Sequence, residues 1–355
     1  MKKRIIVVTT HMTNGGAQRV LSSLVNEWRK NNNEVMIIQT RPGTYSDSYA
    51  LDRGADIINL KVRGNELVDC ILNVPSLIKI LRKYKDATVV AFLNSCITLV
   101  GLASFFVPNR IIFSERNDPD QYPTKRIKRN IRDMMFRRAD VCVFQTEDAR
   151  NHFHKKVQNK GVIIPNPVND RLPDRYQGQR EKKIVAVGRL SKQKNFPLLI
   201  KAFTEVHKKY PEYKLLIYGN DEGEGDNLRK LINELYLDSS VILMGFCSDI
   251  YGAINNATMY VSSSDYEGIS NSMIEALGLG LPTICTDCPV GGARQMIHNG
   301  VNGILVPIND QGALVNAMLR IIEDRKFAEE IANEAYGIRK QYPVDKVSQM
   351  WINLM

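Results

Sequence analysis

The chain of 355 residues lacks any apolar run long enough to cross a bilayer. Its longest apolar stretch, residues 96–107, falls well short of the ~20 residues that a transmembrane helix needs. The apolar segment that follows the basic residues 2–4 is shorter still, so it predicts a buried strand and not a secretion signal. We therefore expect no membrane-spanning segment.

Cysteine is also scarce, because the chain has six and they are scattered. Only Cys285 and Cys288 have CxxC spacing, and no second ligand pair follows at the distance that a structural zinc site requires. Asp118 and Asp120 have the DxD spacing that can hold a divalent cation, but the turn between them offers no further ligand. The sequence therefore predicts no metal site, and scattered cysteines are typical of a reduced, cytosolic protein.

Only the first half of the chain has fewer acidic than basic residues by a wide margin. Residues 1–170 contain 27 Lys and Arg against 16 Asp and Glu, whereas residues 171–355 contain 21 against 22. The net charge of +10 therefore lies entirely in the first half. This imbalance predicts an anionic partner for that half, such as a membrane surface, a nucleic acid or a phosphate-bearing substrate.

Short apolar strands alternate with helical patterns along the whole chain, which has the composition of a globular protein and the length of two domains. Strands are expected at 4–10, 34–39, 55–60, 88–92, 110–114, 140–144, 184–187, 214–218, 241–244, 258–262 and 282–285. Residues 165–183 have no apolar period and predict a linker. The pattern predicts an α/β protein with two doubly wound parallel sheets, whose ligands bind beyond the carboxyl ends of the strands.

Residues 121–138 predict an amphipathic helix with a basic polar face. Its apolar positions follow helical spacing and predict the packed face: Ile127, Ile131, Met134 and Met135. Much of the remaining surface is expected to carry the cations Lys125, Arg126, Lys128, Arg129 and Arg132. Such a helix is typical of binding to a membrane surface or to an acidic partner, and the alternative is a packed helix with a solvated face. The charge of the first half favours an anionic partner.

Residues 260–282 end a strand, break into Ser, Asp and Gly, and begin a helix at Ser270 and Asn271, which are both good N-cap residues. The unpaired N–H groups of a helix start suit a phosphate. Glu267 and Glu275 carry carboxylates that suit sugar hydroxyls. Together they indicate a nucleotide sugar, and the alternative is an ordinary capped helix with two surface glutamates.

Two glycine-containing turns follow predicted strands. Gly15 and Gly16 follow the first strand but lack the GxGxxG spacing of a dinucleotide site. Gly188 ends a strand in the second half, and Arg189 and Lys194 flank the loop that follows. Two cations at a strand end would clamp a diphosphate, although solvated surface charges are the alternative.

The order of these motifs resembles that of retaining glycosyltransferases with the GT-B fold, specifically family 4. The resemblance spans the chain and rests on GGAQRV at 15–20, GRLSKQKNF at 188–196, EGISNSMIE at 267–275 and GILVP at 303–307. It implies two Rossmann-like domains facing a cleft, with a C-terminal helix that crosses back to the first domain. Residues 1–170 with 344–355 would bind the acceptor, and residues 171–343 would bind the nucleotide-sugar donor.

The resemblance also implies roles for individual residues. Arg189 and Lys194 would hold the donor diphosphate and stabilise the leaving group, Glu267 would face the transferred sugar, and Glu275 would bind the ribose. The other donor-binding positions would be Gly15, Gly16, Gly188, Gly219, Phe246, Gly268, Ser270 and Asn271. No residue is a convincing covalent nucleophile, so front-face displacement is expected. Because Arg189 and Lys194 would neutralise the diphosphate, we expect neither a metal nor a further cofactor.

Two positions depart from the family pattern. Arg116 falls where many relatives carry His, and a permanently charged guanidinium cannot act as a general base, so an electrostatic or structural role on the acceptor side is expected. Gln295 falls where relatives often carry Glu, which bears on the sugar contacts.

The string SERNDP and the compact length resemble bacterial enzymes of capsule, O-antigen and exopolysaccharide synthesis. Such an enzyme would move a hexose or N-acetylhexosamine, usually from a UDP donor, to a polyprenyl-diphosphate-linked saccharide. It would be a cytoplasmic protein, attached peripherally to the cytoplasmic face of the membrane. The alternatives are another GT-B enzyme, such as a UDP-sugar epimerase, and a basic nucleic-acid-binding protein. We expect no nucleic acid, because aromatic residues do not interleave with the basic run.

Overall fold

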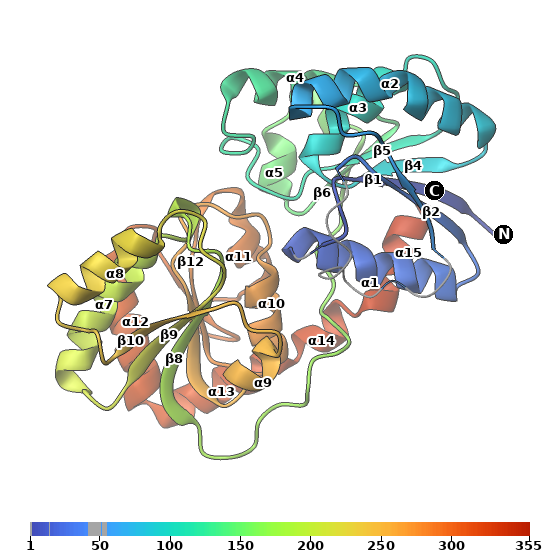
Figure 1. Cartoon of the computed structure of the whole chain (residues 1–355). Helices are drawn as coiled ribbons and strands as arrows, with labels where there is room; N and C mark the ends of the chain where they lie inside the picture. The colour runs from blue at the N-terminus through green and yellow to red at the C-terminus, as the bar shows by residue number, and fades with distance from the viewer. Residues whose placement is uncertain (1, 14, 42–50, 52–54) are drawn as a thin grey trace. The chain divides into compact units, whose positions relative to one another are not determined.

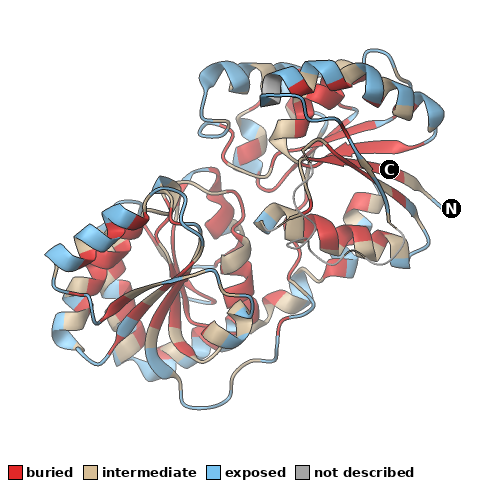
Figure 2. Ribbon diagram, viewed as in Figure 1, coloured by how far each residue is buried: buried red, intermediate tan, exposed pale blue. Residues whose placement is uncertain are grey.

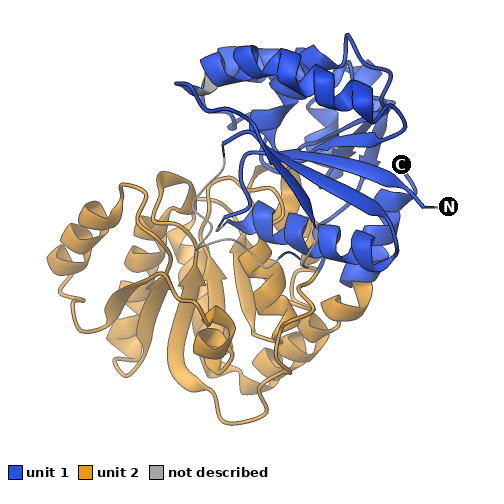
Figure 3. Cartoon of the chain, turned by 45° about the vertical axis from the view of Figure 1, so that its right-hand side comes forward, with its two compact units in different colours: residues 1–167, 342–355 blue, residues 168–341 orange. Residues whose placement is uncertain are grey.

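The computed structural model describes residues 2–13, 15–41, 51 and 55–355, so Asn14 of the first glycine turn lies outside the described residues. The chain divides into two compact units (Figure 3). Unit 1 comprises Met1–Pro167 and Tyr342–Met355, and unit 2 comprises Val168–Gln341. The two boundaries fall after residues 167 and 341, whereas the sequence predicted them slightly later, after residues 170 and 343.

In the part of the chain that the structure describes, unit 1 contains a seven-stranded parallel sheet in the order β3-β2-β1-β4-β5-β6-β7. Its strands are β1 (Arg4–Thr9), β2 (Glu34–Gln39), β3 (Asp56–Asn59), β4 (Thr88–Ala91), β5 (Ile111–Ser114), β6 (Val141–Phe144) and β7 (Gly161–Ile163). The order reverses between β1 and β4, which is where open α/β sheets bind ligands. Every residue of β4, β5 and β6 is buried (Figure 2), as the continuous apolar runs predicted.

Helices cover both faces of this sheet (Figure 1). They are α1 (Gly16–Lys30), α2 (Glu66–Lys83), α3 (Asn94–Ala103), α4 (Arg126–Phe136), α5 (Glu147–Asn151), α6 (Lys155–Gln158) and α15 (Val344–Ile352). α2, α3 and α4 pack side by side on one face, and α1 packs against α15 on the other. Trp351 of α15 lies in the core of unit 1, with its ring centroid 6.3 Å from that of Trp28 and 5.7 Å from that of Phe92. The predicted return of the C-terminal helix to the first domain is therefore confirmed.

Within the described residues, unit 2 contains a six-stranded parallel sheet in the order β10-β9-β8-β11-β12-β13. Its strands are β8 (Glu181–Val187), β9 (Lys214–Tyr218), β10 (Val241–Gly245), β11 (Ala257–Ser262), β12 (Thr283–Thr286) and β13 (Ile304–Val306). The order reverses between β8 and β11, so a second ligand site is expected at their carboxyl ends. The α/β prediction of two doubly wound parallel sheets is confirmed.

The helices of unit 2 also lie on both faces of its sheet (Figure 1). They are α7 (Phe196–Lys209), α8 (Gly225–Glu234), α9 (Ile250–Ile254), α10 (Asn271–Gly278), α11 (Gly292–Met296), α12 (Gln311–Glu323), α13 (Arg325–Tyr336) and α14 (Ile338–Gln341), with 3-10 turns η2 (Lys192–Lys194) and η3 (Pro289–Gly291). α7 packs between α8 and α12, whereas α10 packs on β11 and β12 from the other side. Among the described residues, no helix is both long and apolar enough to span a membrane.

Candidate functional site

Two loops at the carboxyl ends of β8 and β11 bring predicted catalytic residues of unit 2 together. Lys194 lies at the end of η2, and Glu267 lies in the loop between β11 and α10. The ammonium of Lys194 donates to Oε1 of Glu267, and both side chains are withdrawn from solvent, at 13% and 16% exposed. The hydroxyl of Ser264 donates to the same oxygen at 3.3 Å. Lys194 is therefore not a solvated surface charge, which was the alternative interpretation for Arg189 and Lys194, whereas Arg189 is exposed.

Asn195 explains why the two loops stay together. It has a left-handed backbone, with φ of 44°, and its side-chain oxygen caps α7. Its side-chain amide donates to Oδ1 of Asp265 at 2.7 Å and to Oδ1 of Asn309 at 3.0 Å. The hydroxyl of Ser263 donates to the carbonyl of Lys194 at 2.9 Å. These cross-links hold Lys194 beside Glu267.

The N-terminus of α10 forms the next part of the site. Ser270 is the N-cap residue, yet its side chain makes no capping hydrogen bond. Its hydroxyl lies 3.1 Å from that of Ser272, whose own hydroxyl donates to the carbonyl of Val187 at the end of β8, also at 3.1 Å. The helix start is thus tied to the end of β8, with the helix dipole directed at the loop that carries Glu267.

Glu275 and Gly268 are both enclosed by the fold. Glu275 lies in α10 and is only 6% exposed, so the alternative of two surface glutamates is wrong. A Cβ atom at Gly292 would lie 1.8 Å from the carbonyl oxygen of Gly268, so α11 packs directly on the loop before α10. Gln295 is half-buried on the same short helix.

Glycines occupy the ends of neighbouring strands β8, β9 and β10. Gly219 has φ of +149°, and a Cβ there would lie 1.9 Å from the carbonyl oxygen of Gly188. The N–H of Gly219 donates to Gly245 at 2.8 Å, and the neighbouring Phe246 is largely exposed. This edge therefore offers close backbone approach beside an exposed aromatic ring, a combination that suits a flat base.

Arg189 forms an ion pair with Glu222, a residue that the sequence analysis did not identify. Its Nη1 lies 2.9 and 2.8 Å from the two carboxylate oxygens of Glu222, in the loop after β9, and both side chains are exposed. Because both side chains are exposed, this ion pair contributes only roughly 0–1 kcal/mol to the stability of the fold. Glu222 therefore holds Arg189 only weakly.

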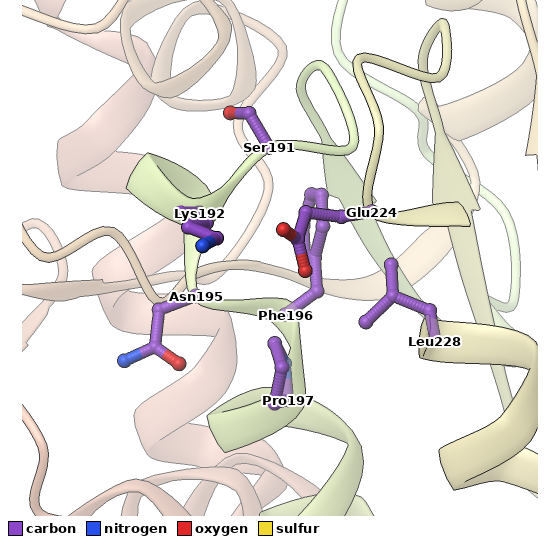
Figure 4. Close-up of a pocket in the computed structure, with 7 residues that line it drawn as sticks. All are labelled: Ser191, Lys192, Asn195, Phe196, Pro197, Glu224 and Leu228. Carbon is purple, nitrogen blue, oxygen red and sulfur yellow. The ribbon is translucent and has the colours of Figure 1, made fainter. Parts of the chain in front are cut away.

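One cavity of unit 2 borders the β8–α7 loop, and a smaller cavity, bordered by the β11–α10 loop, contains predicted donor residues. The larger, of about 190 Å³, is lined by Ser191, Lys192, Asn195, Phe196, Pro197, Glu224 and Leu228 (Figure 4). The smaller lies under Glu267, Gly268 and Ser270, and the buried thiols of Cys285 and Cys288 form part of its wall. Burial raises the pKa of the Cys288 thiol to about 12, so this group is an uncharged thiol at neutral pH.

The basic helix of unit 1 is oriented differently from the prediction. Ile127 and Met134, expected to pack, are 68% and 53% exposed, whereas Arg132, expected on the exposed basic face, is 1% exposed. The ring of Phe136 determines this orientation. Its centroid lies 5.7 Å from that of Phe113, 5.9 Å from that of Phe144 and 4.6 Å from that of Phe153. This aromatic cluster turns Arg132 inward, so its predicted exposed position is wrong.

The other cations of the helix differ in their surroundings. Lys125, Arg126 and Lys128 are exposed, as predicted. Arg129 is half-buried, and its Nη1 donates to the carbonyls of Pro123 and Thr124, at 2.9 Å each. Arg129 therefore fastens the chain just before α4.

Arg116 is half-buried in unit 1 and makes structural contacts. Its guanidinium carbon lies 4.9 Å from the ring centroid of Phe92 and 6.0 Å from that of Trp351. It also donates to the carbonyl of Ile164, at 3.3 Å, and to the side chain of Asn166. Burial lowers the pKa of Arg116 to about 9, and the group remains a cation at neutral pH.

The two carboxylates of the DxD segment do not converge. Asp118 is buried, and its Oδ1 accepts the backbone N–H of Asp120 at 2.8 Å. The side chain of Asp120 points instead to His152, with Oδ1 2.9 Å from Nδ1. Among the described residues, no three His, Cys, Asp or Glu side chains are grouped as metal ligands would be.

Gly15 is the N-cap residue and Gly16 the first residue of α1, the helix that comes next after β1 and begins at the carboxyl edge of the unit 1 sheet. This is the place that the first glycine turn predicted. Their contact with a donor stays a prediction, as do the donor contacts of Asn271 and of the other predicted site residues.

Family models and curated relatives agree with this geometry. A model described as Glycosyltransferase Family 4 matches residues 14–172, and one described as Glycosyl transferases group 1 matches residues 172–337. The chain is 29% identical over 262 residues to an uncharacterized glycosyltransferase of Methanocaldococcus jannaschii, covering 61% of this chain and 63% of that protein. The match thus spans less than two thirds of that relative's length.

Two Campylobacter jejuni relatives have more specific names. The first is an N-acetylgalactosamine-N,N'-diacetylbacillosaminyl-diphospho-undecaprenol 4-alpha-N-acetylgalactosaminyltransferase. The chain is 31% identical to it over 170 residues, and this match covers 48% of this chain and 45% of that protein. The chain is 22% identical over 362 residues to a second alpha-1,4-N-acetyl-D-galactosaminyltransferase, whose named acceptor is a diNAcBac-PP-undecaprenol saccharide. That match covers 100% of this chain and 98% of the relative.

Solved structures share the fold over the whole chain. Anabaena HepE in complex with UDP and glucose has a TM-score of 0.84 at 18% identity, covering 99% of this chain and 98% of that one. TarM, of which a mutant from S. aureus is also solved, has a TM-score of 0.85 at 15% identity, covering 100% and 99%. The chain therefore belongs to the family 4 type of glycosyltransferases and has their GT-B fold.

Proposed function

We propose that this glycosyltransferase is a retaining, metal-independent enzyme of bacterial surface polysaccharide synthesis. It moves a hexose or N-acetylhexosamine from a UDP-sugar to a polyprenyl-diphosphate-linked saccharide. The observation that carries the proposal is the pairing of Lys194 with Glu267 beside the α10 N-terminus, at the carboxyl edge of the unit 2 sheet. This places a cation, a carboxylate and a helix dipole within one site.

The donor's diphosphate would bind at the N-terminus of α10 and between Lys194 and Arg189. Both cations are paired with carboxylates, Glu267 and Glu222 respectively. A diphosphate would take over these cations because it carries more charge than either carboxylate. Glu267 would then accept hydrogen bonds from the transferred sugar, while Glu275 would accept those of the ribose hydroxyls.

The chemistry proposed is front-face displacement. The bond between the sugar C1 and the diphosphate oxygen breaks, and the acceptor oxygen bonds to C1 on the same face. The leaving diphosphate takes the proton of the acceptor hydroxyl. Lys194 and Arg189 stabilise the negative charge that develops on the diphosphate, and the site contributes by positioning and electrostatics.

The lipid-linked acceptor is supported by the names of the two Campylobacter relatives and by the surface of unit 1. Lys125, Arg126 and Lys128 are exposed on α4 together with Ile127 and Met134. Cations mixed with exposed apolar side chains suit the headgroup region of an anionic leaflet. The corrected orientation of α4 thus supports peripheral attachment at the cytoplasmic face of the membrane.

A second exposed apolar group lies at the end of the neighbouring α3. Phe105 and Phe106 are both more than half exposed, and Arg138 lies over the Phe105 ring at 4.2 Å. Since α3 packs against α4, this pair belongs to the same layer of unit 1 as the exposed cations. It adds exposed phenylalanine rings, which are common on the apolar face of interfacial segments.

The proposal is tested by incubating the whole chain with UDP-sugars, with and without a polyprenyl-diphosphate-linked saccharide, and analysing the products. A glycosyl product with the donor's anomeric configuration, formed only with the acceptor, is expected. Conversion of the nucleotide sugar without any acceptor would instead identify an epimerase. An inverted linkage would refute the retaining mechanism.

A further inference from the structure

A buried guanidinium in unit 1 fastens the loop that joins β5 to α4. The Nη2 of Arg132 donates to the carbonyl of Pro119 at 2.8 Å, and its Nη1 donates to the carbonyl of Tyr122 at 2.5 Å. The same Nη1 lies 3.3 Å from Oε2 of Glu115, at the start of the loop. One side chain therefore holds three points of residues 115–122.

Glu115 organises the first turn of this loop. It is fully buried, and its Oε1 accepts the backbone N–H groups of Arg116 and Asn117, at 3.0 Å each. It also accepts the side-chain amide of Asn94, the first residue of α3, at 2.8 Å. The loops that follow β4 and β5 are thus joined through one carboxylate, next to the strand where the sheet order reverses.

His152 fastens the far side of the loop. Its Nδ1 lies 2.9 Å from Oδ1 of Asp120, and its Nε2 lies 3.5 Å from Oδ2 of Asp133 on α4. Nη2 of Arg132 lies 3.3 Å from the same Nε2. His152 thereby connects the loop tip to α4, and its side chain is only partly exposed.

We propose that Arg132 and His152 are positioning residues, which fix the loop of residues 115–122 as the platform for the acceptor. The inference rests on the proposed function, because it takes this carboxyl edge of the unit 1 sheet as the acceptor side. Carboxyl edges near the strand-order reversal are where such sheets bind ligands. A loop held at this many points can present backbone groups to an acceptor without paying for its ordering at each binding event.

The charged groups that face His152 make its contacts with Asp120 and Asp133 depend on pH. Asp133 and Asp120 raise the pKa of His152, and Asp133 is the larger influence, whereas burial and the Arg132 cation oppose them. Asp118 is the further acid of the loop whose charge acts on His152. Since the folded-state pKa is raised, the imidazolium contacts are present at lower pH and are lost as pH rises through that pKa.

The first test measures amide hydrogen exchange of residues 115–122 in the full chain. The variants are Arg132→Met and the milder His152→Gln, which removes charge from a partly exposed side chain and keeps the protein foldable. Arg137→Met, an exposed arginine at the end of the same helix, is the matched control. Loop protection factors should fall about tenfold in both variants and stay unchanged in the control.

Above the pKa of His152, the wild type should lose protection in residues 118–121, whereas His152→Gln should show no such pH step. Unchanged protection in both variants, or an equal loss in Arg137→Met, would overturn the inference.

The second test separates the acceptor from the donor. With farnesyl-diphosphate-linked N-acetylglucosamine as acceptor probe, His152→Gln should raise the acceptor KM about tenfold and leave the UDP-sugar KM within twofold. A matching rise in the donor KM, or no change in the acceptor KM, would overturn the positioning role. If the wild type transfers nothing to any lipid-linked probe, the proposed function fails, and the exchange measurement still decides whether Arg132 and His152 fix the loop.

Discussion

Replacing Lys194 by alanine removes the cation that we propose stabilises the leaving diphosphate. Loss of one such preorganised group costs about 2.7–4 kcal/mol in the transition state, so kcat should fall by roughly 10²–10³. The stability cost should be smaller. Glu267 would lose its ammonium partner but keep the Ser264 hydroxyl, and both members of the pair retain some solvent contact. Discounting a buried pair for that contact leaves about 1–3 kcal/mol of lost stability, or roughly 2–12 °C in the Tm of unit 2.

The assay is steady-state transfer from a saturating UDP-sugar, well below the lowered Tm. Lys192→Ala is the matched control, because Lys192 lies in the same 3-10 turn but is exposed. Its kcat should stay within about twofold of the wild type. A Lys194→Ala enzyme that turns over within threefold of the wild type, while folded, would refute the proposed role.

Three further outcomes are expected. Glu275→Gln should weaken UDP binding about tenfold in isothermal titration, and unchanged affinity would remove the ribose assignment. Neutralising Lys125, Arg126 and Lys128 should weaken binding to anionic vesicles by about 1 kcal/mol for each cation, or roughly a hundredfold together, in a flotation assay at low salt. If the variant binds vesicles as the wild type does, these cations form only a solvated face of α4. Trp351→Ala should destabilise unit 1 by about 3–5 kcal/mol in urea unfolding, because a fully buried ring that packs on Trp28 is lost.

Much of the fold followed from local patterns in the sequence. The central strands are apolar on both faces and were recognisable as buried parallel strands. The helix start at Ser270 was visible from its N-cap residues, Ser270 and Asn271. These features depend on neighbouring residues, which periodicity and capping rules describe.

The orientation of α4 could not be derived in the same way. Its periodicity fitted a packed face with Ile127 and Met134, but the aromatic cluster around Phe136 determined which face packs. The burial of Arg132 depends on Glu115, a partner that belongs to another element. A cation is buried only where such partners exist, and tertiary partners are invisible to a helical pattern.

The pairing of Arg189 with Glu222 and the cross-link from Asn195 to Asp265 were missed for the same reason. Each joins loops that follow different strands of the unit 2 sheet. These loops are close because of the order of the strands in the sheet. The sequence predicted doubly wound parallel sheets but not the order of their strands.

The central claim, a nucleotide-sugar site built on Lys194, Glu267 and α10, is tested most directly by thermal unfolding with UDP-, GDP- and ADP-sugars. A ligand at a hundred times its Kd stabilises the folded state by about 2.7 kcal/mol. UDP-sugars should raise the Tm of the wild type by several degrees and that of Lys194→Ala much less. If no nucleotide sugar raises the Tm, or if the variant responds as the wild type does, the account is contradicted.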